Sequence, residues 1–286
     1  MLVKTFHDNA TATFTHIVVD ESTKKCAVID SVLDYDHFSG SVKTASADAV
    51  IAYIKEHDLT NEWILESHIH ADHITASSYL KTHIGGQTAM GKGIVDVLAI
   101  WVPMFSNQVD TPITGEQFDV LLDEGDTIKI GNITLTTWLT PGHTPACASY
   151  YCADNKAIFV GDTMFAPHLG TARCDFPGGS AADLFKTVQR FYTLPDDTQV
   201  YLCHDYPEEG EEAISVVSIA DEKANNIQIK PDTVFAEYVK KREARDATLA
   251  VPKLLFPSIQ TNLRLGDFGV KSENGLQYIK IPVNAL

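Results

Sequence analysis

The sequence is poor in positive charge. Lysine and arginine together number 22, against 38 aspartates and glutamates, which gives a net charge of −16. A surface of this charge repels the phosphate backbone of nucleic acids and the headgroups of anionic lipids. We therefore expect no nucleic acid partner and no membrane partner, and the composition weighs against a nuclease.

Long apolar segments are also missing. The first residues, Met1–Asp8, contain no apolar run with a cleavage site, and no uninterrupted apolar stretch approaches the length that crosses a membrane. Cysteines are few, because the chain has only five, and they are scattered and odd in number. This pattern argues against a disulfide framework and favours a reducing compartment. We expect a cytoplasmic protein.

What remains is the composition of an ordinary globular protein. The chain has 286 residues, of which 44% are hydrophobic and 21% are charged, and it has no internal repeat and no long polar tract. This length is sufficient for one large core. One α/β domain is therefore the expectation.

Four side chains that can bind a metal occur within the six residues His68–His73 (HIHADH). They follow an apolar run from Trp63 that predicts a buried strand, and they precede a run at residues 74–82 that predicts a helix. In extended backbone, residues two apart point the same way, so His68 and His70 can converge on one point. Imidazole and carboxylate suit zinc, iron or manganese. The spacing therefore predicts a metal site rather than ordinary polar loop residues.

Other strands and helices are predicted along the chain. A hairpin of strands at residues 14–20 and 25–30 begins the fold, and apolar spacing predicts a helix from Ser46, as a possible N-cap, to His57. The remaining predicted elements are a helix at residues 91–101, strands at residues 127–130, 133–139, 148–152, 157–160 and 200–203, a charged helix at residues 232–249, and a strand at residues 276–281.

Three more candidate ligands lie just past the last apolar residue of a predicted strand. His143 follows the strand at 133–139, Asp162 follows the strand at 157–160, and His204 follows the strand at 200–203. The run His68–His73 has the same position relative to its own strand. We therefore expect all these side chains to gather along one edge of the sheets.

This series of residues resembles the metal ligands of the metallo-β-lactamase superfamily. The match runs from His68–His73 through His143 and Asp162 to His204, and so spans most of the chain. The resemblance implies an α/β fold of the four-layer αββα metallo-β-lactamase sandwich type. We expect a catalytic domain at residues 1–230 and a C-terminal extension at residues 231–286 that packs on the same domain.

Within the superfamily, the sequence resembles the persulfide dioxygenase branch, also called sulfur dioxygenases, and bacterial proteins labelled β-lactamase hydrolase-like. The resemblance is carried by TPGHT at 140–144, GDT at 161–163, GTARCDF at 170–176, and in the tail by ARDATL at 244–249 and KIPVNAL at 280–286. Such enzymes oxidise glutathione persulfide with O2 to sulfite and glutathione, which serves sulfide detoxification. The resemblance also implies two protein partners. One is a sulfurtransferase that delivers the persulfide, and the other is a second copy of the chain, bound through the tail.

In that family one Fe(II) is held by the residues that match His68, His143 and Asp162. The resemblance therefore implies one iron per chain on these three residues. Two histidines and one carboxylate on one face of a metal leave other positions open for substrate and oxygen.

The remaining members of the series, which are His70, Asp72, His73 and His204, would then orient the ligands and donate hydrogen bonds near the substrate. The ligand inventory leaves a second interpretation open. With Asp162 as a bridging carboxylate, the seven residues can hold two zinc or iron ions, as in a hydrolase of the glyoxalase II type that acts on a glutathione thioester or a lactone. A non-catalytic metal-binding or sulfur-sensing protein is the third interpretation, and the intact ligand series disfavours it.

Three residues are candidates for contact with the substrate. Arg173 can bind a glutathione carboxylate through its planar guanidinium, or form an ion pair with Asp175 instead. Tyr206 can reach the bound substrate, or fill the core. Cys174 can lie near the persulfide, or be a buried and unreactive thiol. The basic run Lys240–Arg245 can attract an anionic thiol, although a solvated helix face is the simpler interpretation.

Overall fold

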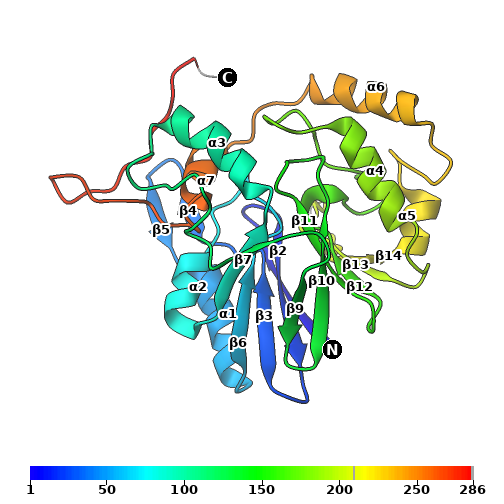
Figure 1. Cartoon of the computed structure of the whole chain (residues 1–286), viewed down its shortest axis with the longest axis horizontal. Coiled ribbons are helices and arrows are strands. Elements are labelled where there is room, and N and C mark those ends of the chain that lie inside the picture. Colours follow the sequence, from blue (N-terminus) through cyan, green and yellow to red (C-terminus); the bar gives the residue numbers. More distant parts are fainter. Residues whose placement is uncertain (209, 285–286) are drawn as a thin grey trace.

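Two six-stranded β-sheets pack face to face in the centre of the molecule (Figure 1). The computed structural model describes residues 1–208 and 210–284. The first sheet has the strand order β1 (Leu2–Asp8), β2 (Thr13–Asp20), β3 (Lys25–Ile29), β6 (Thr60–Leu65), β7 (Gln87–Gly91) and β8 (Val120–Leu122). The second has the order β14 (Val216–Ser218), β13 (Gln199–Tyr201), β12 (Ala157–Phe159), β11 (Ala148–Cys152), β10 (Ile133–Leu139) and β9 (Thr127–Ile130). A small hairpin joins β4 (Asp34–Asp36) to β5 (Ser41–Lys43).

The apolar runs of β2 and β3 explain why both faces of the first sheet are covered. Val18 and Ile29 pack between the two sheets, whereas Ile17 and Val28 pack toward the helices on the outer face. Successive side chains of a strand point to opposite faces, so a continuous apolar run is buried only where both faces are covered.

Helices cover the outer face of each sheet, as Figure 1 shows. They are α1 (Ala45–Glu56), α2 (Ser77–Ile84), α3 (Ile94–Phe105), α4 (Ala181–Phe191), α5 (Ile219–Asn225), α6 (Phe235–Asp246) and α7 (Leu255–Asn262), with a short 3-10 turn at Gly161–Thr163. Val50 and Ile54 of α1 pack on the first sheet, and Leu184 and Val188 of α4 pack on the second. The predicted αββα sandwich is confirmed. None of the helices in the described part of the chain is long and apolar enough to cross a membrane.

The residues after position 230 contribute two helices that pack on the rest of the chain. Helix α6 contacts α4, and α7 contacts α3. The predicted strand at residues 276–281 is wrong, because these residues have no partner strand among the described residues and the side chains of Leu276, Tyr278 and Ile281 are exposed. Of the tail motif at 280–286, Ala285 and Leu286 lie outside the described residues.

The predicted hairpins at residues 14–30, 127–139 and 148–160 are confirmed, but two helix starts are wrong. Ser46 does not cap α1, because its backbone N–H and hydroxyl both donate to the Asp34 carboxylate, at 3.0 and 2.7 Å. The helix predicted from Ile74 begins at Ser77 instead. Ile74 is held in a β-bridge, in which its carbonyl accepts from the Leu33 N–H at 2.7 Å.

The predicted helix at residues 91–101 is also shifted. It begins at Ile94 and ends at Phe105, because Gly91 is the last residue of β7. Sequence reasoning missed the strands β1, β4, β5, β7, β8 and β14, and it missed the helices α4, α5 and α7. The short strands β7 and β8 lack the alternating pattern that marks a strand, since β7 (QTAMG) is buried over almost its whole length.

His16 of β2 links the two sheets. Its Nε2–H donates to the Leu202 carbonyl at 2.8 Å, directly after β13, and its Nδ1 lies 2.9 Å from the Thr5 hydroxyl. The ring is 2% exposed, and this burial lowers its pKa from 6.5 to about 4, because the charged form would lose its hydration.

We expect His16→Gln to reduce the acid sensitivity of the fold. His16 stays neutral in the folded protein but takes a proton in the unfolded chain below pH 6.5, so stability is lost as the pH falls from 6.5 to about 4. This amounts to about 2 kcal/mol at roughly pH 5. Urea unfolding near pH 7 and near pH 5 measures the effect, with the exposed His57→Gln as control. An identical loss of stability in the wild type and His16→Gln would contradict the assignment.

Candidate metal centre

The candidate ligands follow strands of both sheets. The run His68–His73 follows β6 of the first sheet, whereas His143, Asp162 and His204 follow β10, β12 and β13 of the second. Strand β3 pairs in parallel with β6, and β12 pairs in parallel with β13, so within each sheet the carboxyl ends lie at the same edge. The side chains therefore meet where these two edges face each other.

The two sheets are joined by backbone hydrogen bonds next to this point. The Phe14 N–H at the start of β2 donates to the Cys203 carbonyl at 2.7 Å, and Thr13 forms a β-bridge with His204. The position of His204 is thus set by a strand of the opposite sheet.

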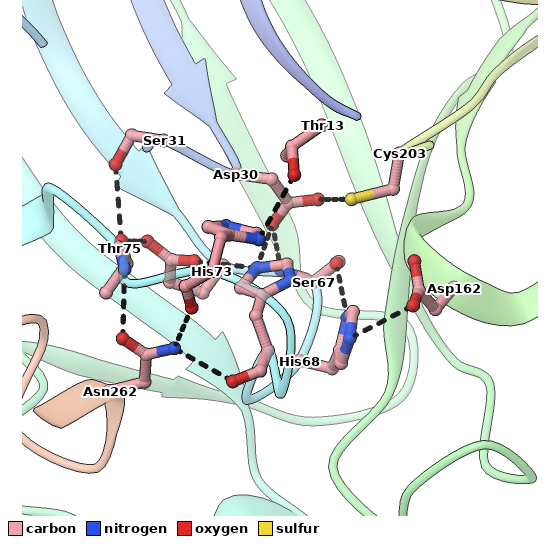
Figure 2. Close-up of polar contacts among 12 residues, drawn as sticks. Thr13, Asp30, Ser31, Ser67, His68, His73, Thr75, Asp162, Cys203 and Asn262 are labelled. Carbon is pink, nitrogen blue, oxygen red and sulfur yellow. Dashed lines mark hydrogen bonds and ion pairs between the residues drawn. The ribbon is translucent and has the colours of Figure 1, made fainter. Parts of the chain in front are cut away.

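The first group of candidate ligands contains His68, His143 and Asp162, whose ligand atoms all lie within 4.8 Å of one another. The Nε2 atoms of His68 and His143 lie 3.7 and 3.8 Å from Asp162 Oδ2. The Ser67 hydroxyl lies 3.0 Å from His68 Nδ1 (Figure 2). His143 Nδ1–H donates to the Arg173 carbonyl at 2.7 Å, which leaves Nε2 as the atom that can bind a metal.

Asp162 reaches this group because the chain before it comes unusually close to the first sheet. Gly161 has a φ of +53°, and a Cβ atom there would lie 2.4 Å from the Ser67 hydroxyl oxygen. Only glycine fits both the left-handed backbone and this close approach.

The second group contains His70, Asp72, His73 and His204, and its ligand atoms also lie within 4.8 Å of one another. His204 Nε2 lies 3.3 Å from Asp72 Oδ2 and 3.3 Å from Asp162 Oδ1. Asp162 therefore stands between the two groups, with Oδ2 toward the first and Oδ1 toward the second. The Thr13 hydroxyl lies behind the second group, 3.3 Å from His73 Nδ1.

Unpartnered buried atoms indicate that these groups bind a cation. Among the described residues, six buried atoms of the two groups have no hydrogen-bond partner, and they are His68 Nε2, His70 Nδ1, Asp72 Oδ2, His73 Nε2, Asp162 Oδ1 and His204 Nε2. Each such atom costs about 1–3 kcal/mol when it is buried without a partner. Six of them at one point are explained by a metal, and imidazole and carboxylate donors suit zinc, iron or manganese. The residues present therefore fit a metal cofactor.

The protonation states of His68 and Asp72 suit metal binding. Burial, together with the neighbouring rings of His70 and His143, holds the pKa of His68 well below its usual value, so that its imidazole is neutral. Burial alone would raise the pKa of Asp72, but His204 and His73 outweigh it and lower the pKa. A neutral imidazole and an ionised carboxylate are the forms that bind a metal.

Two carboxylates lie behind His70. Its Nε2 is 3.2 Å from Asp30 Oδ1 and 3.1 Å from Glu66 Oε2, so Nε2–H is directed away from the cluster and Nδ1 remains without a partner. Burial lowers the pKa of His70, but the two carboxylates outweigh burial and raise it well above the usual value. Asp30 also accepts from the Ser67 N–H at 2.7 Å, and its backbone has a φ of +51°, which is rare for aspartate.

Asn262, the last residue of α7, fixes the backbone of the His68–His73 loop. Its amide donates to the carbonyl of His70 at 2.9 Å and to that of His73 at 2.8 Å, and its side-chain oxygen accepts from the Thr75 N–H at 2.9 Å (Figure 2). The side chain is 2% exposed. The C-terminal segment therefore helps to position the metal loop.

A cavity of about 380 Å³ adjoins the metal groups. Asp72, His143 and Asp162 form part of its wall, and Tyr206 lies at the same end. The ring of Tyr206 is half exposed and stacks on His204, with ring centroids 6.2 Å apart. The other wall residues include Phe165, Leu169, Phe176, Arg173, Gln228, Arg242 and Arg245. A cavity of this size and lining is typical of a small-molecule site.

The structure places Arg173 in the wall of the cavity and Cys174 away from it. The Arg173 guanidinium lines the cavity but pairs with Asp175, with contacts of 2.6 and 2.7 Å, so the alternative ion pair is the one that forms. Cys174 does not line this cavity, because its side chain packs in the core between the second sheet and its helices. Burial raises the pKa of this thiol, which makes it unreactive.

Sequence reasoning missed four residues that support the site. They are Thr13, Asp30, Glu66 and Asn262. The sequence could have indicated Asp30, because it is an acidic residue at the end of an apolar strand, like Asp162. Nothing in the sequence indicates a role for Asn262, because it lies 189 residues after His73, in a segment for which no helix or strand was predicted.

The chain resembles known proteins over most of its length. Residues 10–204 match the family model of the metallo-beta-lactamase superfamily. Glyoxylase B2 from Dictyostelium discoideum is 45% identical over 285 residues, which cover 99% of this chain and 97% of that protein. A beta-lactamase hydrolase-like protein from Xylella fastidiosa is 40% identical over 286 residues, which cover 99% of this chain and 65% of that protein.

The chain is also similar, at lower identity, to persulfide dioxygenases. The mitochondrial persulfide dioxygenase ETHE1 from Homo sapiens is 28% identical over 267 residues, which cover 93% of this chain and 89% of that protein. The crystal structure of ETHE1 from Myxococcus xanthus superposes with a TM-score of 0.74 at 28% identity, and covers 93% of this chain and 100% of that one.

We expect Asn262→Ala to loosen the metal loop. It removes three hydrogen bonds to buried backbone groups, which should cost about 3 kcal/mol of unfolding free energy and lower metal affinity roughly 10- to 100-fold. Asn226→Ala is the matched control, because Asn226 is also buried and hydrogen-bonded but touches no candidate ligand. Chelator competition and thermal unfolding measure the two effects. Equal metal affinity in the two variants would show that Asn262 acts on stability alone.

Proposed function

The chain belongs to the metallo-β-lactamase superfamily, and on this premise we propose that it is an iron-dependent persulfide dioxygenase. The substrates would be glutathione persulfide and O2, and the products sulfite and glutathione. The observation that carries the proposal is the group of His68, His143 and Asp162, in which two imidazoles and one carboxylate converge at the wall of the cavity. Similarity to persulfide dioxygenase ETHE1 over 93% of the chain supports it.

His68, His143 and Asp162 would hold one Fe(II) in this site. Two histidines and a carboxylate are the ligand set of non-haem iron oxygenases, which keep positions open for substrate and oxygen. The iron supplies the redox chemistry that allows O2 to react with sulfur. In the overall reaction the sulfur–sulfur bond breaks, the outer sulfur gains two oxygen atoms from O2 and one from water, and glutathione leaves as the thiol.

The residues of the chain orient the reactants and shield them. Ser67 and the Arg173 carbonyl fix the rings of His68 and His143 through their Nδ1 atoms. Phe165 and Phe176 form apolar parts of the cavity wall, which excludes water from the sulfur. Tyr206, at the metal end of the cavity, is a hydrogen-bond donor for the bound substrate.

A second candidate function is a dinuclear hydrolase that acts on a glutathione thioester or a lactone. The observation that favours it is the second donor group, together with Asp162, whose two oxygens face both groups. Two close metals activate a bridging hydroxide, and this chemistry requires no oxygen. The 45% identity to Glyoxylase B2 also supports this alternative.

Metal content and oxygen uptake separate the two functions. We expect about one iron per chain in protein expressed with iron available, and oxygen uptake on addition of glutathione persulfide. Elemental analysis and an oxygen electrode measure both quantities on the same sample. About two metals per chain, with no oxygen uptake and with turnover of a thioester or lactone, would replace the dioxygenase by the hydrolase.

Single-ligand variants test which group holds the metal. His143→Ala should lose most of its iron and all activity, because it removes one of three ligands. His204→Ala should retain most of its iron, because His204 belongs to the second group. His83→Ala is the control, since this exposed ring pairs with Tyr79 and belongs to neither metal group. Complete loss of iron in His204→Ala would contradict the one-iron assignment.

A further inference from the structure

A small apolar pocket lies beside the metal cavity, in the core between the metal loop, α3 and α7. Its wall includes Ile69 and Ala71 of the loop, Val97 and Trp101 of α3, and Ile259 of α7. All five side chains are buried. The centre of a water-sized molecule can move through about 10 Å³ of this pocket, which is room for one such molecule.

The pocket suits an apolar molecule better than water, because a buried water needs about two to four polar partners. Thr144 contributes a hydroxyl to the wall, but this hydroxyl already lies 3.2 Å from the Cys147 sulfur. The Thr144 N–H donates to the same sulfur at 3.3 Å. The other side chains of the wall are aliphatic or aromatic. Pockets of this kind stay dry and take up apolar molecules such as xenon.

The pocket adjoins the metal cavity, because Ala71 and Phe176 belong to the walls of both. Ala71 stands between the candidate ligands His70 and Asp72 in the sequence, and its side chain is a single methyl group. The half-buried ring of Phe176 packs edge-on against the His143 imidazole, with ring centroids 5.3 Å apart. A molecule in the pocket is therefore one layer of side chains away from the candidate metal ligands.

The two substrates of the proposed reaction differ in polarity. A peptide persulfide is polar and enters through the open cavity, and once bound it narrows this route for a second molecule. Dioxygen is apolar, so it passes favourably from water into apolar surroundings. A separate apolar entry would let oxygen approach the metal while the thiol substrate fills the cavity.

We propose that the pocket between Ile69, Val97 and Ile259 is a binding site for dioxygen, from which oxygen reaches the metal end of the cavity past Ala71 and Phe176. This inference rests on the proposed function, because it takes oxygen as a substrate. It gives oxygen a site of its own, apart from the cavity that receives the thiol substrate. Phe176 then has a second role, since movement of its ring opens the way between the pocket and the cavity.

Crystals of the full chain under xenon pressure test the site apart from catalysis. Xenon is an apolar probe, and its electron density shows directly where it binds. We expect xenon between Val97 and Ile259 in the wild type. Val97→Phe should exclude it, because the ring fills the pocket, and Val97→Ala should increase its occupancy. The matched control is Val102→Phe, since Val102 is buried on the same helix but does not line the pocket. This variant overpacks the core by about 1–3 kcal/mol and should still bind xenon.

Kinetics at varied oxygen concentration test the route to the metal. In Val97→Phe the KM for O2 should rise roughly fivefold, while kcat at saturating oxygen and the KM for glutathione persulfide stay unchanged. Val102→Phe should match the wild type. Val97→Ala should lower the KM for O2, and it keeps the test decisive if Val97→Phe fails to fold.

Three results would overturn the proposal. The first is an unchanged KM for O2 in folded Val97→Phe or Val97→Ala, and the second is an equal rise in Val102→Phe. The third is oxygen uptake by a wild type whose pocket takes no xenon, and this result would leave the dioxygenase in place. Xenon in the pocket of a wild type without oxygen uptake has the opposite meaning. It would refute the dioxygenase, while the pocket stands as a site for an apolar gas.

Discussion

The buried carboxylate of Asp30 holds together the parts of the chain that form the metal centre. It accepts from the Ser67 N–H and lies next to His70 Nε2 on the first sheet, and its other oxygen contacts the Cys203 thiol, 3.7 Å away, on the second. Figure 2 shows this carboxylate between the two. An ionised group buried this deeply is stable only while its hydrogen-bond donors stay in place. The relative position of the two sheet edges, and therefore of every candidate ligand, depends on these contacts.

The placement of Asp162 is compatible with two kinds of metal chemistry. Its two oxygens face two donor groups, one with two histidines and one with three histidines and an aspartate. The same protein scaffold can therefore serve chemistry with one metal or with two, and the difference depends on small shifts of the side chains. The residues that line the cavity, rather than the candidate metal ligands, indicate which substrate fits. Its arginines favour an anionic ligand, although the protein as a whole is strongly acidic.

The gathering of the candidate ligands at one edge of the sheets was predictable from the sequence, because local pattern places each of them after a strand. His68, His143 and Asp162 each follow an apolar strand, and parallel strands bring their ends to one edge. The supporting contacts were not predictable in this way. Ser46 looked like a helix cap, but Asp34 binds it. Arg173 was a candidate to bind a substrate carboxylate, but it forms the alternative ion pair with Asp175. Residues 276–281 alternate like a strand but find no partner strand in the described part of the chain. In each case a contact decided by the folded chain overrides local propensity.

The position of Asn262 has a consequence for the order in which the site is completed during protein synthesis. The chain is made from its N-terminus, so His68 to His204 have all left the ribosome before α7 is made. Until then the carbonyls of His70 and His73 lack the amide that holds them. The nascent chain thus carries all the candidate ligands while the His68–His73 loop is still loose, so that a metal bound there would exchange readily. Docking of α7 ends that period, and a metal in the site would then be harder to replace.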